Sequence, residues 1–520
     1  MSNPASSVGP MMGPTQSRDP KLFHYSVNLE KRIRPNNPLR QIKEKIDFSF
    51  VRSAVAPFYG RDGHESEDPV VILKLMLLLF LDNVASEREL MRIVGERLDY
   101  LWFLEMDLDD EIPNHSVLSK ARKRWGKEVF QDLFVRIVRA CVEAGLVLGE
   151  KIHMDGSLIN ANASMGSLQS GCPELMEQLR AAYRREEAKL ETSNGANDEG
   201  ATCSMKPWRH RTVSKTDPDA VLMRKGAESA RPRYKQHRAV DDQCGVITAV
   251  ETTPADINEN EKLIELVRQH EANTGEKVRT IVADAQYGTS DNFAICQQSA
   301  IRSHMADLRA TYTNDAATRG IFRETDFHYD KQTDTYVCPA GQRLKRAKNQ
   351  SQNTYIYRGS KKICGDCALR SQCMRSKHWR TIRRHIHYDL VQQARRESHS
   401  GWARRDRRRR RHLMEGSFAD AINHGFKRAR WRRLHNQQIQ DFLIAVCQNL
   451  RILLGSERRR NAAAMVVSVP AIAQGSKGRR FGTSRFALYD IGSAFSRTRD
   501  RARTAVAQFS EVNSTLGNSP

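Results

Sequence analysis

The first part of the chain has apolar residues at steps of three and four positions. Residues 69–83, 86–106 and 115–145 all show this spacing, which is typical of amphipathic helices. We therefore predict an all-helical N-terminal domain over residues 38–148. Residues 1–37 begin with a Pro, Ser, Gly and Met-rich stretch without periodicity, and we predict a disordered leader there.

The pattern changes after residue 150. Short alternating or apolar runs at residues 151–156, 234–242, 245–253, 278–288 and 301–308 indicate strands. Residues 258–273 and 290–298 have helical spacing between them. This β-β-β-α-β-α-β order predicts an α/β domain over residues 149–455, with a mixed sheet flanked by helices.

Two inserts interrupt this α/β domain, at about residues 165–230 and 320–400, because both stretches are polar and only weakly periodic. After residue 401 the chain is helical and basic. Residues 436–454 carry apolar side chains at helical spacing, so this segment should dock on a core. We expect residues 456–520 to form a basic, largely disordered tail.

Charge narrows the class of partner. The chain of 520 residues has 84 Lys and Arg against 61 Asp and Glu, a net charge of +23, which favours binding to polyanions such as nucleic acid. A basic protein that is merely kept soluble by its charge is the alternative. The N-terminus has no secretory pattern and the apolar run at residues 75–81 is too short to span a bilayer, so we expect a cytoplasmic protein with no membrane partner.

Three carboxylates are candidates for a metal site. Asp155 and Asp284 end strands that should lie side by side, and Glu415 is followed by Phe418, Ile422 and Phe426 at helical steps. That stripe would turn Glu415 toward the sheet. Alternatively, Glu415 is a helix N-terminal acid paired with Arg411, and the aspartates are ordinary turn residues.

Such carboxylates suit the chemistry of phosphodiester cleavage. Two divalent ions about 3.5 to 4 Å apart can stabilise the attacking and leaving oxygens, and Mg²⁺ prefers oxygen ligands. We therefore predict two Mg²⁺ or Mn²⁺ ions held by Asp155, Asp284 and Glu415.

Four of the ten cysteines gather in the second insert. Cys338, Cys364, Cys367 and Cys373 include one CxxC pair, and four thiolates suit a closed structural Zn²⁺ site. Reduced free thiols are the alternative, and the other cysteines are scattered singly.

Basic residues cluster in two places. A capped helix near residues 113–126 could be a helix-turn-helix reading head or a solvated face, and the region after residue 401 interleaves Arg with Trp. The candidate DNA-binding residues are Lys120, Arg122, Lys123, Arg124, Arg408, Lys427, Arg428, Arg430, Arg432 and Arg433.

Five ordered blocks resemble one known family. They are HMDGSLINANAS at residues 153–164, SKTDPDAVLMRKG at 214–226, YKQHRAVDD at 234–242, VADAQYG at 282–288 and EGSFADAINHGFKRARWRRL at 415–434. The blocks resemble those of bacterial insertion-sequence DDE transposases of the cut-and-paste group. The resemblance covers about residues 40–455 and implies an RNase H-like catalytic core with a helical N-terminal domain.

The resemblance also implies an activity and a site. Asp155, Asp284 and Glu415 would be the catalytic metal-binding triad, and the arginine that family members place four residues before the Glu falls on Arg411. The activity would be cleavage at transposon ends and strand transfer into target DNA, with double-stranded inverted repeats and target DNA as partners. A homodimer or larger synaptic assembly at the bacterial nucleoid is expected.

The chain departs from the family at two positions. Relatives often have Tyr seven residues before the Glu and Lys seven after it, where this chain has Arg408 and Ile422. Two other functions compete with transposition. One is an RNase H-like nuclease without strand transfer, and the other is an inactive DNA-binding relic or regulator.

Overall fold

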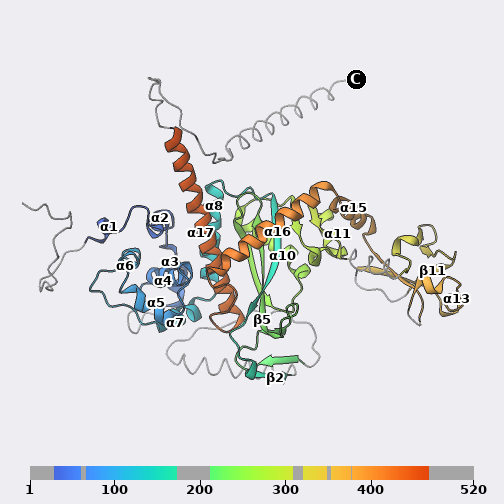
Figure 1. The fold of residues 1–520 in the computed structure, drawn as a ribbon, viewed down its shortest axis with the longest axis horizontal. Helices are drawn as coiled ribbons and strands as arrows, with labels where there is room; N and C mark the ends of the chain where they lie inside the picture. Colours follow the sequence, from blue (N-terminus) through green and yellow to red (C-terminus); the bar gives the residue numbers. More distant parts are fainter. Residues whose placement is uncertain are drawn as a thin grey trace, which may run out of the picture. The chain divides into compact units, whose positions relative to one another are not determined.

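The computed structural model describes residues 28–59, 66–171, 211–308, 320–347, 353–375 and 378–467. The expected leader up to residue 27, much of the first insert and the tail from residue 468 lie outside these ranges. The contact pattern separates residues 1–461 from residues 462–520, and the description below concerns the first of these units. Figure 1 labels its elements.

The N-terminal region is helical, as predicted, but its first helix begins within the expected leader. Helix α4 is buried along most of its length, because residues 72–80 are all buried. It begins at a proline, and the Asp68 side chain accepts a hydrogen bond from the Val70 amide, which satisfies one free amide of the first turn. The elements are α1 (Leu29–Arg32), α2 (Pro38–Lys45), α3 (Phe50–Val55), η1 (Ala56–Phe58), α4 (Pro69–Leu81), α5 (Glu87–Val94), α6 (Leu98–Leu104), α7 (Ser116–Trp125) and α8 (Glu128–Glu143).

A mixed six-stranded sheet follows, and its strand order confirms the predicted neighbours. The order is β4-β5-β1-β7-β8, with β6 also paired to β5. Strand β1 is antiparallel to β5 and parallel to β7, and β7 is parallel to β8. The strands are β1 (Lys151–Asn160), β4 (Val221–Met223), β5 (Arg231–Asp241), β6 (Ile247–Pro254), β7 (Thr280–Ala283) and β8 (Arg302–Met305).

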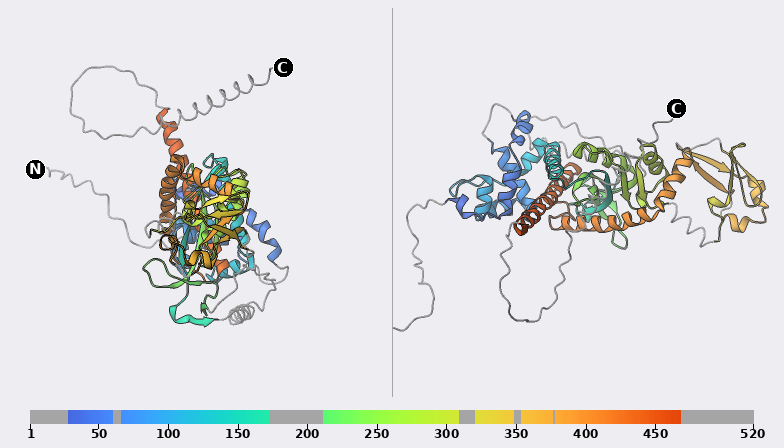
Figure 2. Two further views of the ribbon diagram at one scale, coloured as in Figure 1. Left: turned by 90° about the vertical axis from the view of Figure 1, so that its right-hand side faces the viewer. Right: turned by 90° about the horizontal axis from the view of Figure 1, so that it is seen from above.

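Helices cover this sheet and tie it to the N-terminal region. Helix α10 (Leu263–Thr274) contacts β5 and β6, whereas α16 (Gly401–Ile422) contacts β1, β7 and β8. Helix α11 (Ser290–Gln298) matches its predicted range and packs on α15 (Tyr388–Ser398). Figure 2 shows α16 and α17 (Leu434–Val467) as long helices. Buried residues of α17 share one hydrophobic core with those of α4, which confirms the predicted docking.

The second insert contains strands that the sequence pattern did not predict. A five-stranded antiparallel sheet in the order β13-β12-β11-β10-β9 has its own core of aromatic and aliphatic side chains. Its elements are η5 (Glu324–Asp326), β9 (His328–Asp330), β10 (Thr335–Val337), β11 (Arg343–Arg346), β12 (Thr354–Arg358), α13 (Lys361–Gly365), α14 (Arg370–Cys373) and β13 (Thr381–His385). In the first insert, η2 (Met165–Ser167) precedes β2 (Leu168–Gly171), which pairs with β3 (Arg211–Ser214).

Two boundaries differ from the prediction. Asp155 lies in the middle of β1 and does not end it, because β1 continues to Asn160 alongside β5. Helix α17 continues to Val467, beyond the expected start of the tail at residue 456. Within the described residues no helix has both the length and the apolar character needed to cross a membrane.

Buried polar residues link the sheet to the C-terminal helices. Arg238 on β5 and Asp441 on α17 are both fully buried. Arg238 donates to the Ser417 hydroxyl at 2.8 Å, and Asp441 accepts a hydrogen bond from Thr252 at 2.6 Å. Burial raises the pKa of Asp441 to about 7, although the Thr252 hydrogen bond and the charge of Arg238 act to lower it.

The raised pKa of Asp441 predicts a pH-dependent stability. Because the folded-state pKa lies above the ordinary value of 3.8, the stability that Asp441 contributes is complete below about pH 4 and is lost as the pH rises through about 7. Asp441→Asn should therefore gain stability relative to the parent protein between pH 5 and pH 8, by up to about 3 kcal/mol. Thermal melts of both proteins across this range measure the gain. Asp132→Asn, at an exposed position on α8, controls for the loss of one acid, and a difference that does not change with pH would contradict the prediction.

Candidate active site

Two carboxylates meet where the parallel strands β1 and β7 stop pairing. The last paired residues are His153 and Val282. Asp155 and Asp284 each lie two positions further on, so they fall on the same face of the sheet. The sequence-based expectation that these two aspartates meet is confirmed, since one oxygen of each lies within 4.8 Å of the other.

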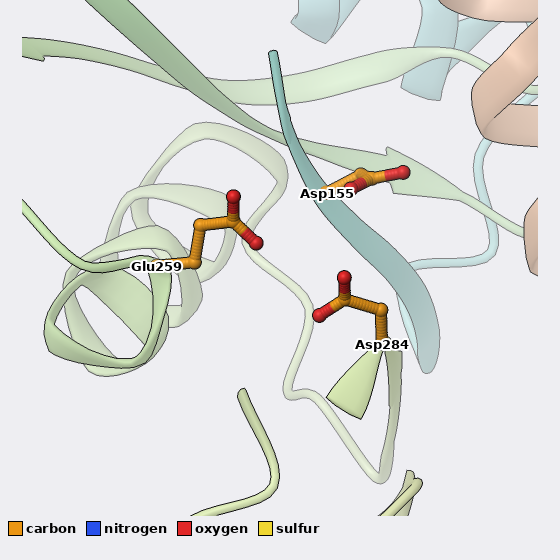
Figure 3. Close-up of side chains that lie close together, drawn as sticks. All are labelled: Asp155, Glu259 and Asp284. Carbon is orange, nitrogen blue, oxygen red and sulfur yellow. The ribbon is translucent and has the colours of Figure 1, made fainter. Parts of the chain in front are cut away.

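Glu259 is the third member of this group. It begins η3 (Glu259–Lys262), just after β6, and one of its oxygens lies within 4.8 Å of an oxygen of each aspartate. Figure 3 shows Glu259 and Asp284 pointing toward each other, with Asp155 beside them. Gly156 leaves the room that Glu259 occupies, because a Cβ at this position would lie 2.9 Å from the Glu259 Oε1 atom.

Two cations partly balance the three carboxylates. Arg410 of α16 donates from Nη1 to Asp155 Oδ2 at 2.8 Å, and Lys235 Nζ lies 3.9 Å from Glu259 Oε1. The other oxygen of Asp155 accepts a hydrogen bond from the Gly156 amide, and Asp284 Oδ1 accepts one from the Gln286 amide. Among these five charged groups, one negative charge is left uncompensated when all are ionised.

Burial and mutual repulsion disfavour the ionised forms. Burial, together with the negative charges of Asp284 and Asp155 and against the opposing charge of Lys235, raises the pKa of Glu259 to about 7. Burial also raises the pKa of Asp155, and Asp284 adds to the rise, while Arg410 opposes it. A bound cation would reverse this balance, because an opposite charge within a few ångströms favours ionised carboxylates.

Tyr287 lies next to the three carboxylates. It ends η4 (Ala285–Tyr287), is fully buried, and its hydroxyl has no hydrogen-bond partner among the described residues. Burial raises the pKa of this phenol well above its usual value, and the charges of Glu259, Asp155 and Asp284 raise it further.

Glu415 and Arg411 are not brought to the carboxylates. Both side chains are exposed on α16, so the prediction that an apolar stripe turns Glu415 inward is wrong. The four residues do not form one buried helix face. Helix α16 ends at Ile422, which is 48% exposed, and Phe426 lies beyond the helix. The role of Glu415 and Arg411 in catalysis stays a prediction.

The face of α16 that packs on the sheet carries different residues. Asp406 accepts hydrogen bonds from His304 and Lys151, Arg410 binds Asp155, and Met414 is buried. These residues recur every four positions. Glu415 comes five residues after Arg410, about 140° around a helix of 3.6 residues per turn, which places it away from the sheet.

Sequence reasoning missed two residues of the site. Glu259 was read only as part of the start of a helix, and nothing local marks it as different from other acids there. Arg410 was one arginine in a run of five. One signal for the buried face of this helix was present in the sequence. Asp406, Arg410 and Met414 follow one another at four-residue steps, and Glu415 does not lie on that line.

The candidate DNA-binding residues divide by exposure. Arg122, a predicted DNA-binding residue, is buried. It pairs with Glu87, and its guanidinium lies 3.7 Å from the centroid of the Trp431 ring. Arg430 and Arg433 also have structural partners, in Asn83 and Asp219 respectively.

The other candidates are partly or fully exposed. Lys427 donates to Ser157, and Arg124 lies over the Tyr59 ring. The exposed members of the set are Lys120, Lys123, Arg408, Arg428 and Arg432.

The four cysteines of the insert line one cavity. They are Cys338, Cys364, Cys367 and Cys373, which are partly exposed and form no disulfide bonds. Within the described ranges, however, no three of their sulfur atoms lie within 4.8 Å of one another. Burial raises the pKa of Cys373, and the neighbouring thiols add to the rise against the effect of Arg380.

Comparisons with known proteins point to one class. Residues 27–124 match a family described as transposase domain (DUF772), and residues 337–454 match a family described as transposase DDE domain. A search of curated proteins gave no match. Among solved structures, a piggyBac transposase synaptic complex with hairpin DNA aligns over 81% of this chain and 74% of that chain at 7% identity, with a TM-score of 0.33. This last likeness is too weak to support an argument.

The two family matches lie at opposite ends of the described fold. One covers the N-terminal helices, and the other runs from the insert through α16 and α17. The aspartates expected from the resemblance meet between these regions, on the central sheet. Both matched families are thus described as transposase domains, and the one that matches residues 337–454 is a DDE domain.

Proposed function

We propose that this transposase cleaves DNA at the ends of its element and joins the freed ends to target DNA at the site formed by Asp155 and Asp284. The observation that carries the proposal is the meeting of these two carboxylates beyond the last pair of β1 and β7. Phosphoryl transfer requires little covalent participation by the protein. The protein's task is therefore to position the reacting groups and to compensate charge.

The residues present fit divalent cations. Carboxylate oxygens are the ligands that Mg²⁺ and Mn²⁺ prefer, and Glu259 adds a buried oxygen, Oε2, that has no hydrogen-bond partner among the described residues. Asp155 and Asp284 would hold the ions. When bound, two such ions neutralise charge on the phosphate and lower the pKa of a coordinated water.

The chain's own groups prepare the DNA for reaction. In the proposed reaction, water attacks the phosphodiester at an element end, and the freed 3′-hydroxyl then attacks target DNA. Exposed Arg408, Arg428 and Arg432 would contact phosphates, and Arg410 would hold Asp155 in place through its ion pair. Because two ends must be joined, the proposal includes a dimer or larger assembly on the bacterial nucleoid.

The nuclease alternative differs from this proposal in a single step. An RNase H-like nuclease would cut but would not join a pre-cleaved 3′ end to a second duplex. An inactive relic or regulator would bind the ends and cut neither strand. A strand-transfer assay with a pre-cleaved end, run beside a cleavage assay on the intact end, separates all three functions.

Removing either aspartate should abolish the chemistry. Asp155→Asn and Asp284→Asn should each lower Mg²⁺-dependent cleavage of an element end by at least about 100-fold, the effect expected when one group that stabilises transition-state charge is lost. Cleavage rates on labelled duplex ends measure this. Asp256→Asn, an exposed acid between β6 and η3, should cleave at the parent rate, and undiminished cleavage by either site variant would refute the assignment.

The exposed arginines should contribute more to the affinity for DNA than to selectivity between DNA sequences. Arg428→Ala should weaken binding to specific and unrelated duplexes alike and lower the salt-dependence slope by about 1, because one phosphate contact is lost. Fluorescence anisotropy at several salt concentrations measures both quantities. Lys277→Ala, an 84% exposed position paired with Glu271, should leave them unchanged. A variant that lost affinity for only one sequence would instead indicate base contact.

We also propose that the insert binds one structural Zn²⁺ through Cys338, Cys364, Cys367 and Cys373. In a tetrahedral site with Zn–S bonds of about 2.3 Å the sulfurs lie about 3.8 Å apart, so the thiols lining this cavity would have to draw together on binding. A closed set of four thiolates leaves no position for substrate, and the zinc would therefore brace the insert without taking part in catalysis.

Elemental analysis tests the zinc site. The purified protein should contain about one zinc per chain, and the double variant Cys364→Ser, Cys367→Ser should lose it and melt at a lower temperature, because metal binding stabilises such sites. Cys244→Ser, an exposed cysteine outside the insert, should keep the metal. Zinc retained by the double variant, or a parent protein free of zinc, would overturn the proposal.

A further inference from the structure

We propose that one face of the antiparallel sheet in the second insert is a further DNA-binding surface, which holds the phosphate backbone of a duplex without reading its sequence. Lys345, Arg358 and Arg383 form this surface, which we call the basic sheet face. The inference rests on the proposed function, because DNA is the partner assigned there. It adds a contact surface that belongs to the insert alone.

The register of the strands places the three cations together. Lys345 on β11 lies directly opposite Arg358 on β12. Arg358 in turn lies opposite Thr381 on β13, and Arg383 follows two residues after Thr381. Arg383 therefore shares this face of the sheet and is a diagonal neighbour of Arg358.

The core of the insert lies on the other face of the sheet. Its members Leu344, Tyr357 and Ile382 each precede one cation or lie next to it along the strand, and all three are buried. Because successive side chains of a strand point to opposite faces, the cations are turned away from the core. Lys345, Arg358 and Arg383 are accordingly exposed.

The three cations differ from the other basic residues of this sheet in having no ion pair among the described residues. A neighbouring carboxylate balances each of the others. These ion pairs are Arg343 with Asp330, Arg346 with Asp334 and Arg384 with Asp389. The basic sheet face therefore keeps its charge for a ligand from outside the insert.

The opposition of Lys345 and Arg358 is unfavourable without a bound anion. Cβ atoms directly opposite each other in an antiparallel pair lie about 4.5 to 5.5 Å apart, and like charges there destabilise the sheet. Asp330 is on the same face but two strands away from Lys345. It already accepts hydrogen bonds from Thr333 at 2.6 Å and Arg343 at 3.3 Å. A polyanion lying across β11, β12 and β13 would relieve the repulsion.

The spread of the cations suits an extended polyanion such as duplex DNA. Three adjacent strands span about 10 Å, and over that length a duplex carries about six phosphates on its two strands. Thr381 lies in the same row as Lys345 and Arg358, and its exposed hydroxyl can donate to a phosphate oxygen. These donors contact phosphate rather than base edges, so they add affinity without sequence choice.

Salt-dependent DNA binding tests the basic sheet face. The triple variant Lys345→Gln, Arg358→Gln, Arg383→Gln is prepared as the full chain, and fluorescence anisotropy follows its binding to a labelled duplex of random sequence. Loss of three phosphate contacts should lower the slope of log K against log salt by about 2 to 3, and weaken binding in about 150 mM salt by at least about tenfold. An unchanged slope would overturn the proposal, and would leave this face to solvent or to an acidic protein partner.

A second triple variant controls for the change in net charge. Arg268→Gln, Lys277→Gln, Arg279→Gln removes three exposed cations from α10 and from the segment between α10 and β7. This segment precedes β7, whereas Asp284 follows the strand at its other end. The control should bind DNA as the parent does. Equal losses in the two triple variants would mean that net charge alone decides binding, and the proposal would fail.

Two further measurements separate lost contacts from lost folding. Because a like-charge pair is removed, the first triple variant should melt at or above the temperature of the parent. The double variant Arg358→Lys, Arg383→Lys keeps both charges and should keep the slope of the parent, since phosphate contacts depend on charge. A lowered slope in this conservative variant would contradict the proposal.

The cleavage assay separates this inference from the proposed function, because DNA binding requires no catalysis. If Asp155→Asn stops cleavage while the first triple variant binds as the parent does, the catalytic site stands and the basic sheet face fails. If that triple variant loses affinity while Asp155→Asn cleaves at the parent rate, the basic sheet face stands and the proposed catalytic site fails.

Discussion

The parallel pairing of β1 with β7 is the constraint on which the site depends. It fixes Asp155 and Asp284 in register, two residues beyond the last pair, and leaves two acids close together where repulsion opposes folding. Buried side chains of β1 and β7 pack in one core with those of α10 and α11. The apolar packing holds the strands in place, so the two aspartates stay close together despite their like charges.

Helix α16 joins the other parts of the site to this pair of strands. At successive four-residue steps it presents Asp406 to His304 and Lys151, and Arg410 to Asp155. About two turns further on, Ser417 accepts a hydrogen bond from buried Arg238. The helix thus fixes the position of Asp155 through polar contacts that are partly shielded from water, where charge-assisted hydrogen bonds are strong. A shift of α16 along its axis would break all of these contacts together.

Much of the sheet could be predicted from the sequence, because alternation and turn signals are local. The strands at residues 234–242 and 245–253, the helix at residues 290–298 and the meeting of Asp155 with Asp284 followed from such patterns. Glu259 could not be predicted, since an acid at a helix start is common for reasons unrelated to metal binding. The orientation of Glu415 was misjudged because the helical pattern was extended through Gly425, whose φ of +83° belongs to the left-handed region that ends helices.

The five consecutive arginines show why charge alone does not define a surface. Arg407 donates to the Ser398 carbonyl, Arg409 pairs with Asp242, and Arg410 pairs with Asp155. Arg408 and Arg411 are left exposed. Helical geometry imposes this division, because neighbouring residues point about 100° apart and so cannot all face one polyanion. The run is therefore divided: three of its arginines bind α15, the segment after β5 and β1, and the other two are exposed.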